Sequence, residues 1–597
     1  MAEYPMSASR RLVGRIVLWS LVGVLAIALL GAAWIGVRAV LAYGHLDNAR
    51  SIAGDAASEL ADPAAAAGLV DRLSDETAAA RSLTGDPVWQ AAQGLPWVGP
   101  QLSAVATVAR TADDVVADAV APLAQVASAF SLDSLRPVDG RFDLSALTAL
   151  QEPAAQSAAQ MRVAADQLAT IDADTLIGPL REPIAQVQTQ LEELAEGADA
   201  LQRATALMPT MLGADGPRNY LVLFQNNAEW RSLGGIPGAM AVIHTEDGRI
   251  SLTAQANTGD FQGGLGELTP LTADQQQLYG SRPLRFVQSV TQLADFTSGA
   301  PLAREIWRNK YGVDVDGVFA VDPVTLSYLL AATGPVTLPT GDVLSEETAV
   351  PLLLNEVYQR YERPKDQDAF FAAATAAVFG TLSSGSVDPA KLVEALVRAG
   401  DEHRLYVWNA DAATQSVLDG TTLQGTLPVT DAETTRFGVY LNDGTGSKMD
   451  YYMSAGASVG WCSTETGAVE AQLSVRLRSD APADAASLPA YITGNGAFGV
   501  PEGETATLAY LYLPPGAEVV SASATGTGAD PTTGFGGGYD GDRRVLTWST
   551  RLLPGEEATA TVRVSVPRTP QLETFLTPGV RPEITAPLTA DCGGAGG

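Results

Sequence analysis

The stretch RNYLVLFQNNAEWRSLGGIPGAMAVI, residues 218–243, decides how the middle of the chain is read. Two apolar runs, 220–224 and 236–243, flank a segment that holds carboxamides, a carboxylate, a guanidinium, a hydroxyl and glycines. Short apolar runs that are bounded by polar residues and glycine are typical of buried strands. The stretch therefore predicts two strands joined by the polar segment NNAEWRSLGG, residues 226–235.

Strand and helix patterns alternate after this segment. ISLTA (250–254) and GVFAV (317–321) read as strands, and LAREIWRNKY (302–311) reads as a helix. Such alternation predicts an α/β layer structure over residues 217–461. Later runs such as VEAQLSVRLRS and EATATVRVSVP are separated by Gly, Pro and Asp, and they predict an antiparallel β-sandwich over residues 462–597.

The N-terminal third has a helical composition. Residues 45–210 are rich in alanine, and their apolar residues recur three and four positions apart, as in amphipathic helices. We expect a long bundle of antiparallel helices, or stalk. Together with the regions that follow, this makes the chain a multidomain α+β protein.

An uncharged apolar stretch, residues 16–37, precedes the bundle and is long enough to cross a bilayer as a helix. Arg10, Arg11 and Arg15 precede it, whereas only Arg38 follows directly. This asymmetry predicts a cytoplasmic tail, residues 1–15, and a main body outside the cytoplasm. A cleaved signal peptide is the alternative, but the apolar stretch runs past a tolerable cleavage site at GAA, 31–33.

Charge and cysteine content narrow the possibilities. The 597-residue chain has a formal net charge of −31, which argues against general binding to nucleic acid. Its only cysteines are Cys462 and Cys592. A disulfide between them would close a loop of about 130 residues, worth about 5 kcal/mol in the chain-entropy model. Two buried free thiols are the alternative, because spacing alone does not prove a bridge.

Several common catalytic motifs are missing from the sequence. The three histidines, His45, His244 and His403, form no HExxH pattern for zinc. GASVG (456–460) matches G-x-S-x-G, but no histidine follows it. GTGSK (444–448) lacks the spacing of a phosphate-binding loop. These patterns disfavour zinc, serine-hydrolase and P-loop chemistry.

The polar segment 226–235 has two readings. At the carboxyl edge of a sheet, Asn227 could donate and accept hydrogen bonds, Glu229 could hold a metal or orient Arg231, and Arg231 could grip a phosphate. Alternatively, the segment is a turn in which Glu229 and Arg231 neutralise each other. The residues themselves do not choose between a site and a turn.

Further basic residues recur in pairs on predicted helices or their flanks. Spacings of three to five would let the members of a pair share one helical face and form a local positive pocket. Solvated helix faces are the alternative. The groups are Arg282 with Arg285, Arg304 with Arg308, and Arg360 with Arg363 and Lys365.

Three blocks together resemble the bacterial domain-of-unknown-function family 4012 (DUF4012). They are RNYLVLFQNNAEWRSLGGIPGAMAVI, VDGVFAVDPVTLSYLLAATGPV (315–336) and NDGTGSKMDYYMS (442–454). With DPVWQAAQGLPWVGPQL (86–102), the likeness extends from about residue 86 to 460. The family is found in membrane-anchored, extracytoplasmic proteins, so the resemblance implies the same location.

The α/β region is more distantly similar to the LytR-CpsA-Psr domain, whose members transfer glycopolymers from polyprenyl-pyrophosphate carriers to the cell wall. The resemblance implies catalytic roles for Glu229 and Arg231 and a divalent cation such as Mg²⁺ on Asp260. The segment around Asp260, ISLTAQANTGDFQGG, lacks the arginine of that family's Pro-Arg-Asp. The residues implied to bind phosphate are Asn227, Arg285, Arg308, Arg360 and Arg363.

These expectations give one leading function and one alternative. The leading function is that of a single-pass, membrane-anchored cell-envelope protein that binds, and in its fuller form transfers, an envelope glycopolymer or its polyprenyl-pyrophosphate-linked precursor. The alternative is a non-catalytic envelope scaffold or adhesion protein with a degenerate active site. The sequence leaves open whether the protein is an enzyme.

Overall fold

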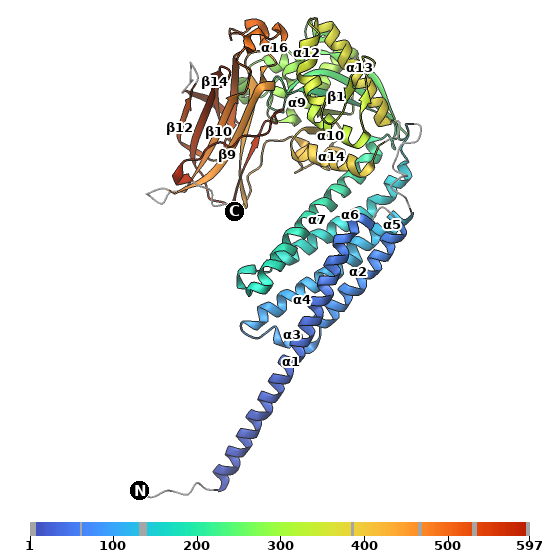
Figure 1. Ribbon diagram of the computed structural model, residues 1–597, viewed down its shortest axis with the longest axis vertical. Coiled ribbons are helices and arrows are strands. Elements are labelled where there is room, and N and C mark those ends of the chain that lie inside the picture. The colour runs from blue at the N-terminus through green and yellow to red at the C-terminus, as the bar shows by residue number, and fades with distance from the viewer. Residues whose placement is uncertain are drawn as a thin grey trace. The chain divides into compact units, whose positions relative to one another are not determined.

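The computed structural model describes residues 8–59, 63–129, 140–383, 387–463, 469–527 and 534–592 (Figure 1). The chain divides into two compact units. The first comprises Met1–Leu135 and Asp143–Pro209, and the second comprises Arg136–Phe142 and Thr210–Gly597. The first seven residues of the predicted cytoplasmic tail lie outside the described residues.

The first unit is helical, as predicted. Its first helix, α1 (Ala8–Glu59), contains the predicted span 16–37 and continues without a break into the bundle. Among the described residues, α1 is the one helix long and apolar enough to cross a membrane. The remaining helical segments are α2 (Pro63–Thr84), α3 (Pro87–Ala92), α4 (Val98–Asp114), a π-helical segment (Val115–Val120), α5 (Ala121–Ala129), α6 (Leu144–Ala169) and α7 (Gly178–Met211).

Small side chains pack the bundle. The largest core cluster within it combines Ala119, Ala164 and Ala195 with Met161, Leu168 and Leu191. Alanine favours helix and lets neighbouring helices approach closely. The alanine-rich composition thus serves both local structure and packing.

The second unit contains a five-stranded mixed sheet with the order β3-β2-β1-β4-β7. The central strand β1 is parallel to β4 and antiparallel to β2. Both segments flanking NNAEWRSLGG are therefore strands of one sheet, as predicted. The bounds are β1 (Arg218–Asn226), β2 (Ile236–Glu246), β3 (Arg249–Asn257), β4 (Gly317–Val321) and β7 (Leu405–Asn409).

The strands of this sheet are apolar on both faces, because successive side chains point to opposite sides. Leu221 and Leu223 of β1 pack in a core cluster with residues of α9 (Phe296–Tyr311). Val222 and Phe224 face the other side, where they line a cavity. The further helices of this region are α8 (Ala273–Tyr279), α10 (Pro323–Thr333), α11 (Ala349–Pro351), α12 (Val357–Arg360), α13 (Pro364–Ser383), α14 (Pro389–Asp401) and α15 (Ala412–Ser416).

Two more sheets form the C-terminal part, and side chains of both share one core cluster. One sheet has the order β13-β14-β11-β8-β16 and the other β12-β15-β10-β9. Their strands are β8 (Thr434–Asp443), β9 (Met453–Ser463), β10 (Val469–Ser479), β11 (Thr505–Tyr512), β12 (Glu518–Gly526), β13 (Phe535–Asp540), β14 (Arg543–Leu552), β15 (Glu557–Ser565) and β16 (Gln571–Leu576). A short hairpin, β5 (Val336–Thr337) and β6 (Val343–Leu344), and a helical turn, α16 (Ala490–Thr493), complete the unit.

Two features of the C-terminal sheets depart from the sequence prediction. The predicted boundary between residues 461 and 462 falls inside β9, and β8 also precedes it. Both strands belong to the C-terminal sheets, because β9 pairs with β10 and β8 pairs with β11, and these partners come later in the chain. The sheets are also not wholly antiparallel, since β16 runs parallel to β8.

Cys462 and Cys592 form a disulfide across a sequence separation of 130 residues. The paired alternative is therefore the one present in the structure. The bridge ties the end of β9 to the C-terminal segment.

Candidate functional site

The segment NNAEWRSLGG forms a compact, buried turn between β1 and β2. The Gly235 amide donates to Gln225 Oε1 at 2.8 Å, and the Ile236 amide donates to the Glu229 carbonyl at 3.0 Å. A β-carbon at Gly235 would lie 2.4 Å from the backbone of Asn226, so only glycine fits there. The turn thus holds Glu229 and Arg231 in fixed positions.

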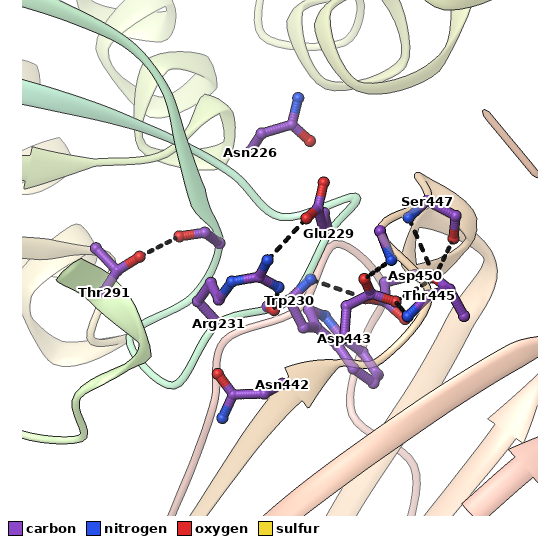
Figure 2. A network of polar contacts seen from close by, with 12 residues as sticks. Asn226, Glu229, Trp230, Arg231, Thr291, Asn442, Asp443, Thr445, Ser447 and Asp450 are labelled. Carbon is purple, nitrogen blue, oxygen red and sulfur yellow. Dashed lines mark hydrogen bonds and ion pairs between the residues drawn. The ribbon is translucent and has the colours of Figure 1, made fainter. Parts of the chain in front are cut away.

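Glu229 lies between two cations, Arg231 and Lys448. Figure 2 shows Glu229 with the first of these, Arg231, whose guanidinium points at its carboxylate. Arg231 Nη2 donates to Glu229 Oε1 at 2.8 Å, and Lys448 Nζ donates to Glu229 Oε2. All three residues are buried. Burial by itself would raise the pKa of Glu229, but Lys448 and Arg231 outweigh it and hold that pKa below its usual value. The turn reading is correct in that Glu229 and Arg231 pair, and Lys448 leaves the trio with one net positive charge.

A second turn, between β8 and β9, supplies Lys448 together with two buried carboxyl groups. Asp443 accepts hydrogen bonds from the amides of Thr445 (2.9 Å) and Gly446 (2.5 Å). Asp450 Oδ2 accepts from the amide of Trp230 at 2.8 Å. Burial raises the pKa of Asp443, with the nearby charge of Glu229 adding to it, and burial and Asp443 raise the pKa of Asp450. The surroundings therefore make ionisation of both carboxyls less favourable than in water.

Hydrogen bonds join these two turns to the C-terminal segment. Asn442 and Ser232 exchange two of them, Ser232 N to Asn442 Oδ1 at 3.2 Å and Asn442 Nδ2 to Ser232 Oγ at 2.9 Å. Thr577 Oγ1 donates to the Ser232 carbonyl at 2.8 Å. Asn227 Nδ2 donates to Asp322 Oδ2 at 3.0 Å and to the Pro578 carbonyl at 3.3 Å. Residues more than 300 positions apart thus build one polar network.

A cavity of about 910 Å³ begins at this network and extends along the sheet. Its volume lies near the upper end of the range of roughly 300–1,000 Å³ that is usual for small-molecule sites. Glu229, Arg231, Asn442, Asp443 and Lys448 line its polar end. The apolar walls are formed from the sheet by Val222, Phe224, Ala239, Ala241, Ile243, Leu252, Phe319 and Val321, and from α10 and α13 by Leu326, Leu329, Phe371, Ala374, Val378, Phe379 and Leu382.

The α13 side of the cavity follows from its sequence. Phe371, Ala374, Val378 and Leu382 recur at three- and four-residue intervals, so they form one stripe along the helix. This stripe lines the cavity, and Ala374 also belongs to a core cluster against which Phe371 and Val378 pack. The helix thus presents an apolar surface to the cavity interior.

Two stacked tyrosines stand beside Lys448. Tyr358 and Tyr491 line the cavity with ring centroids 5.2 Å apart, and Lys448 Nζ lies 6.0 and 5.8 Å from the two centroids. Asn226 Nδ2 donates to the Tyr358 hydroxyl. The ammonium therefore contacts a carboxylate and lies within cation–π reach of two aromatic rings.

The structure brings only part of the predicted site together. Glu229 and Arg231 line the cavity, whereas Asn227 is buried in the network behind it. Arg285 lines a separate cavity of about 510 Å³, and Arg308 is exposed near the end of α9. Neither arginine is among the described residues that line the larger cavity.

The other predicted phosphate and metal ligands make local contacts. Arg360 pairs with Asp342 at 2.8 Å, and Arg363, exposed, pairs with Asp366 at 2.8 Å. Asp260 caps a short helical turn by accepting from the Asn257 amide at 3.0 Å. Among the described residues, no group of three or more His, Cys, Asp or Glu side chains is placed to hold a metal ion. These residues therefore do not complete the predicted constellation.

Most lining residues were not among the predicted site residues; charged and polar examples are Lys448, Asn442, Asp443 and, at an exposed position, Arg282. The first three belong to NDGTGSKMDYYMS, a block that carried only the family resemblance. Its signal was a run of polar and charged residues between two apolar strands, the same signal that singled out NNAEWRSLGG.

Fold and site together define a class. The described residues include one helix able to cross a membrane, and an α/β sheet region shares a buried charged network with C-terminal β-sheets. The family model described as "Protein of unknown function (DUF4012)" matches residues 215–358. The predicted resemblance to DUF4012 is therefore confirmed for the part of the chain that contains the turn 226–235.

Other comparisons add little. A crystal structure of protein gbs0355 from Streptococcus agalactiae is similar at 13% identity, covering 35% of this chain and 74% of that one, with a TM-score of 0.23. A score this low does not define a shared fold. The sequence matches no curated protein.

Proposed function

We propose that this is a single-pass, membrane-anchored cell-envelope protein with its main body outside the cytoplasm, and that its α/β region binds a polyprenyl-pyrophosphate-linked glycopolymer precursor. One observation carries the proposal: a single large cavity combines long apolar walls with a charged end. A lipid-linked pyrophosphate has the same division into a long hydrocarbon part and an anionic part.

The apolar walls suit a prenyl chain. They are formed by the cavity-facing side chains of four strands and by the α13 stripe. Burying hydrocarbon contributes about 0.8 kcal/mol for each CH₂ group removed from water. A short prenyl chain would thus gain several kcal/mol from these walls without any polar contact.

The charged end suits a pyrophosphate. Arg231 and Lys448 carry two positive charges against the single charge of Glu229, and Arg282 lies at an exposed part of the lining. Asp443 is a further carboxyl at this end, and its raised pKa makes its charged form less favourable. Both oxygens of Glu229 already accept from cations, so a Mg²⁺ ion bound with the pyrophosphate would take its ligands mainly from phosphate oxygens and water.

The second candidate function is that of a non-catalytic envelope scaffold or adhesion protein. Both oxygens of Glu229 are engaged by cations, and Arg285, Arg308, Arg360 and Arg363 do not line the cavity. A carboxylate that is held in this way is poorly placed to take a proton. These contacts favour binding without transfer.

Binding can be tested by filling the cavity at Gly238. This glycine lines the cavity, and a β-carbon there meets no atom within 4 Å, so Gly238→Leu would place a side chain in open space. Gly380→Leu on α13 is the matched control, because it also meets open space and is not among the lining residues. The full chain in detergent would be titrated calorimetrically with farnesyl diphosphate.

We expect the wild type and Gly380→Leu to bind, and Gly238→Leu to bind at least about tenfold more weakly, a loss of about 1.4 kcal/mol. Farnesol and inorganic pyrophosphate, each offering half of the ligand, should both bind less tightly than farnesyl diphosphate. Equal binding by the two variants, or no binding by the wild type, would refute the proposal. Release of the head group from a polyprenyl-pyrophosphate oligosaccharide would separate a transferase from a scaffold.

A further inference from the structure

The segment formed by α3, the following turn and the start of α4 carries four exposed apolar side chains, here called the tip: Val88, Leu95, Trp97 and Val98. Their exposed fractions are 43%, 53%, 90% and 48%. The chain has no charged residue from Pro87 to Ala109. A nearly fully exposed tryptophan in an uncharged segment is unusual for a surface that faces only water.

The tip lies beside the membrane end of α1. Ile35 and Ala39 of α1 pack against the core cluster formed by Trp89, Ala92 and Leu102. Asp86, which caps α3, also accepts a hydrogen bond from Arg38 Nε at 2.7 Å. Ile35 is within the apolar stretch 16–37, and one helical turn rises only 5.4 Å. In Figure 1, α3 lies beside α1 where α1 extends alone from the bundle.

The backbone holds the tip in a fixed shape. Trp89 Nε1 donates to the Leu102 carbonyl at 3.1 Å, and the Gly99 amide donates to the Leu95 carbonyl at 2.9 Å. Residues 96–98 form a γ-turn, in which the Val98 amide donates to the Pro96 carbonyl at 2.8 Å and Trp97 has φ 69°. Such a conformation costs a non-glycine residue about 1–3 kcal/mol. The surrounding contacts maintain it with the indole exposed.

We propose that the tip inserts into the outer interface of the membrane that α1 spans. Tryptophan is enriched at this level of a bilayer, because its ring is apolar and its N–H can bond to head groups or water. The neighbouring turn between α6 and α7 carries Asp172 and Asp174, so it stays in water. The inference rests on the proposed membrane span, and it gives the bundle a second attachment to the lipid.

The experiment uses the full chain in phosphatidylcholine vesicles with bimane attached to single introduced cysteines. The native cysteines are joined in a disulfide and do not react. Leu95→Cys reports on the tip, Ile27→Cys reports on the span, and Val163→Cys is the matched control on α6, exposed to 48%. Quenching is measured with nitroxide lipid labelled near the head group and with aqueous iodide.

We expect lipid quenching at position 95 to exceed that at position 163 by at least about threefold, and iodide quenching to show the reverse order. Adding Trp97→Ser to Leu95→Cys should lower the lipid quenching at position 95.

The inference is overturned if position 95 is as open to iodide as position 163. It is also overturned if position 95 is shielded from both quenchers, because a protein surface would then cover it. Lipid quenching at position 27 without quenching at position 95 would reject the tip alone. No lipid quenching at position 27 would reject the span and the tip together.

Discussion

Replacing Glu229 by glutamine would remove the carboxylate that pairs directly with both Arg231 and Lys448. The side chains of Glu229 and Arg231 are only 7% and 6% exposed, and that of Lys448 is 10% exposed. Removing one partner of a buried ion pair costs about 3–5 kcal/mol, because the remaining charge keeps its desolvation penalty. We expect Glu229→Gln to lower the free energy of unfolding of the second unit by that amount. The same change at exposed Glu502 should alter it by less than about 0.5 kcal/mol.

The sign of the pH dependence gives an independent check. Because the folded pKa of Glu229 lies below its unfolded value, its stabilising effect is fully present above the unfolded pKa and is lost as pH falls toward the folded pKa. The difference in free energy of unfolding between wild type and Glu229→Gln should therefore be large at pH 7 and shrink below about pH 4.5. Urea denaturation of the full chain, followed by near-UV circular dichroism, measures it. A Glu229→Gln variant that is as stable as Glu502→Gln at pH 7 would refute the reasoning.

Three further outcomes follow from other contacts. Asp450→Asn should raise the free energy of unfolding at pH 8, because burial raises the pKa of Asp450 and the wild type loses the stabilising effect of its protonated carboxyl as pH rises through the folded pKa. The gain over wild type should be smaller at pH 5. A lower denaturation midpoint for Asp450→Asn at pH 8 would contradict this prediction. Reducing the Cys462–Cys592 disulfide should cost up to about 5 kcal/mol and lower the melting temperature, and an unchanged melting curve in reductant would speak against this. Gly456→Ala should destabilise the C-terminal sheets, since its β-carbon would lie 1.5 Å from the Ile584 carbonyl oxygen. If the amides of β9 exchange hydrogen no faster in this variant than in wild type, the predicted destabilisation is wrong.

The sequence predicted elements better than boundaries. The strands on either side of NNAEWRSLGG could be predicted because their apolar runs and the polar segment between them are local signals. The boundary at residues 461 and 462 could not, because β9 pairs with β10 and no local composition marks which sheet a strand enters. The parallel pairing of β16 with β8 joins Gln571 to Thr434, a long-range choice without a short-range signal.

The sequence singled out some of the residues that line the cavity. Glu229 and Arg231 stood out because both lie in one turn, only two residues apart. Lys448 lies 219 residues from Glu229, so its role depends on tertiary structure alone. Arg360 and Arg363 have the residue type of phosphate ligands, yet Asp342 and Asp366 pair with them on the surface. Residue type could suggest candidate phosphate ligands. Nearby acidic partners decided which of these cations stay at the surface and which line the cavity.

The hydrogen bond between Asn227 and the Pro578 carbonyl joins residues 351 positions apart. During synthesis, which proceeds at roughly 5–20 residues per second, the first half of the network would wait about 20–70 s for its partner to emerge. Until then the turn 226–235 lacks the contacts that Thr577 and Pro578 make to Ser232 and Asn227. A truncated product ending near residue 460 would carry the DUF4012-matching region and the residues of the polar end, but not these C-terminal contacts.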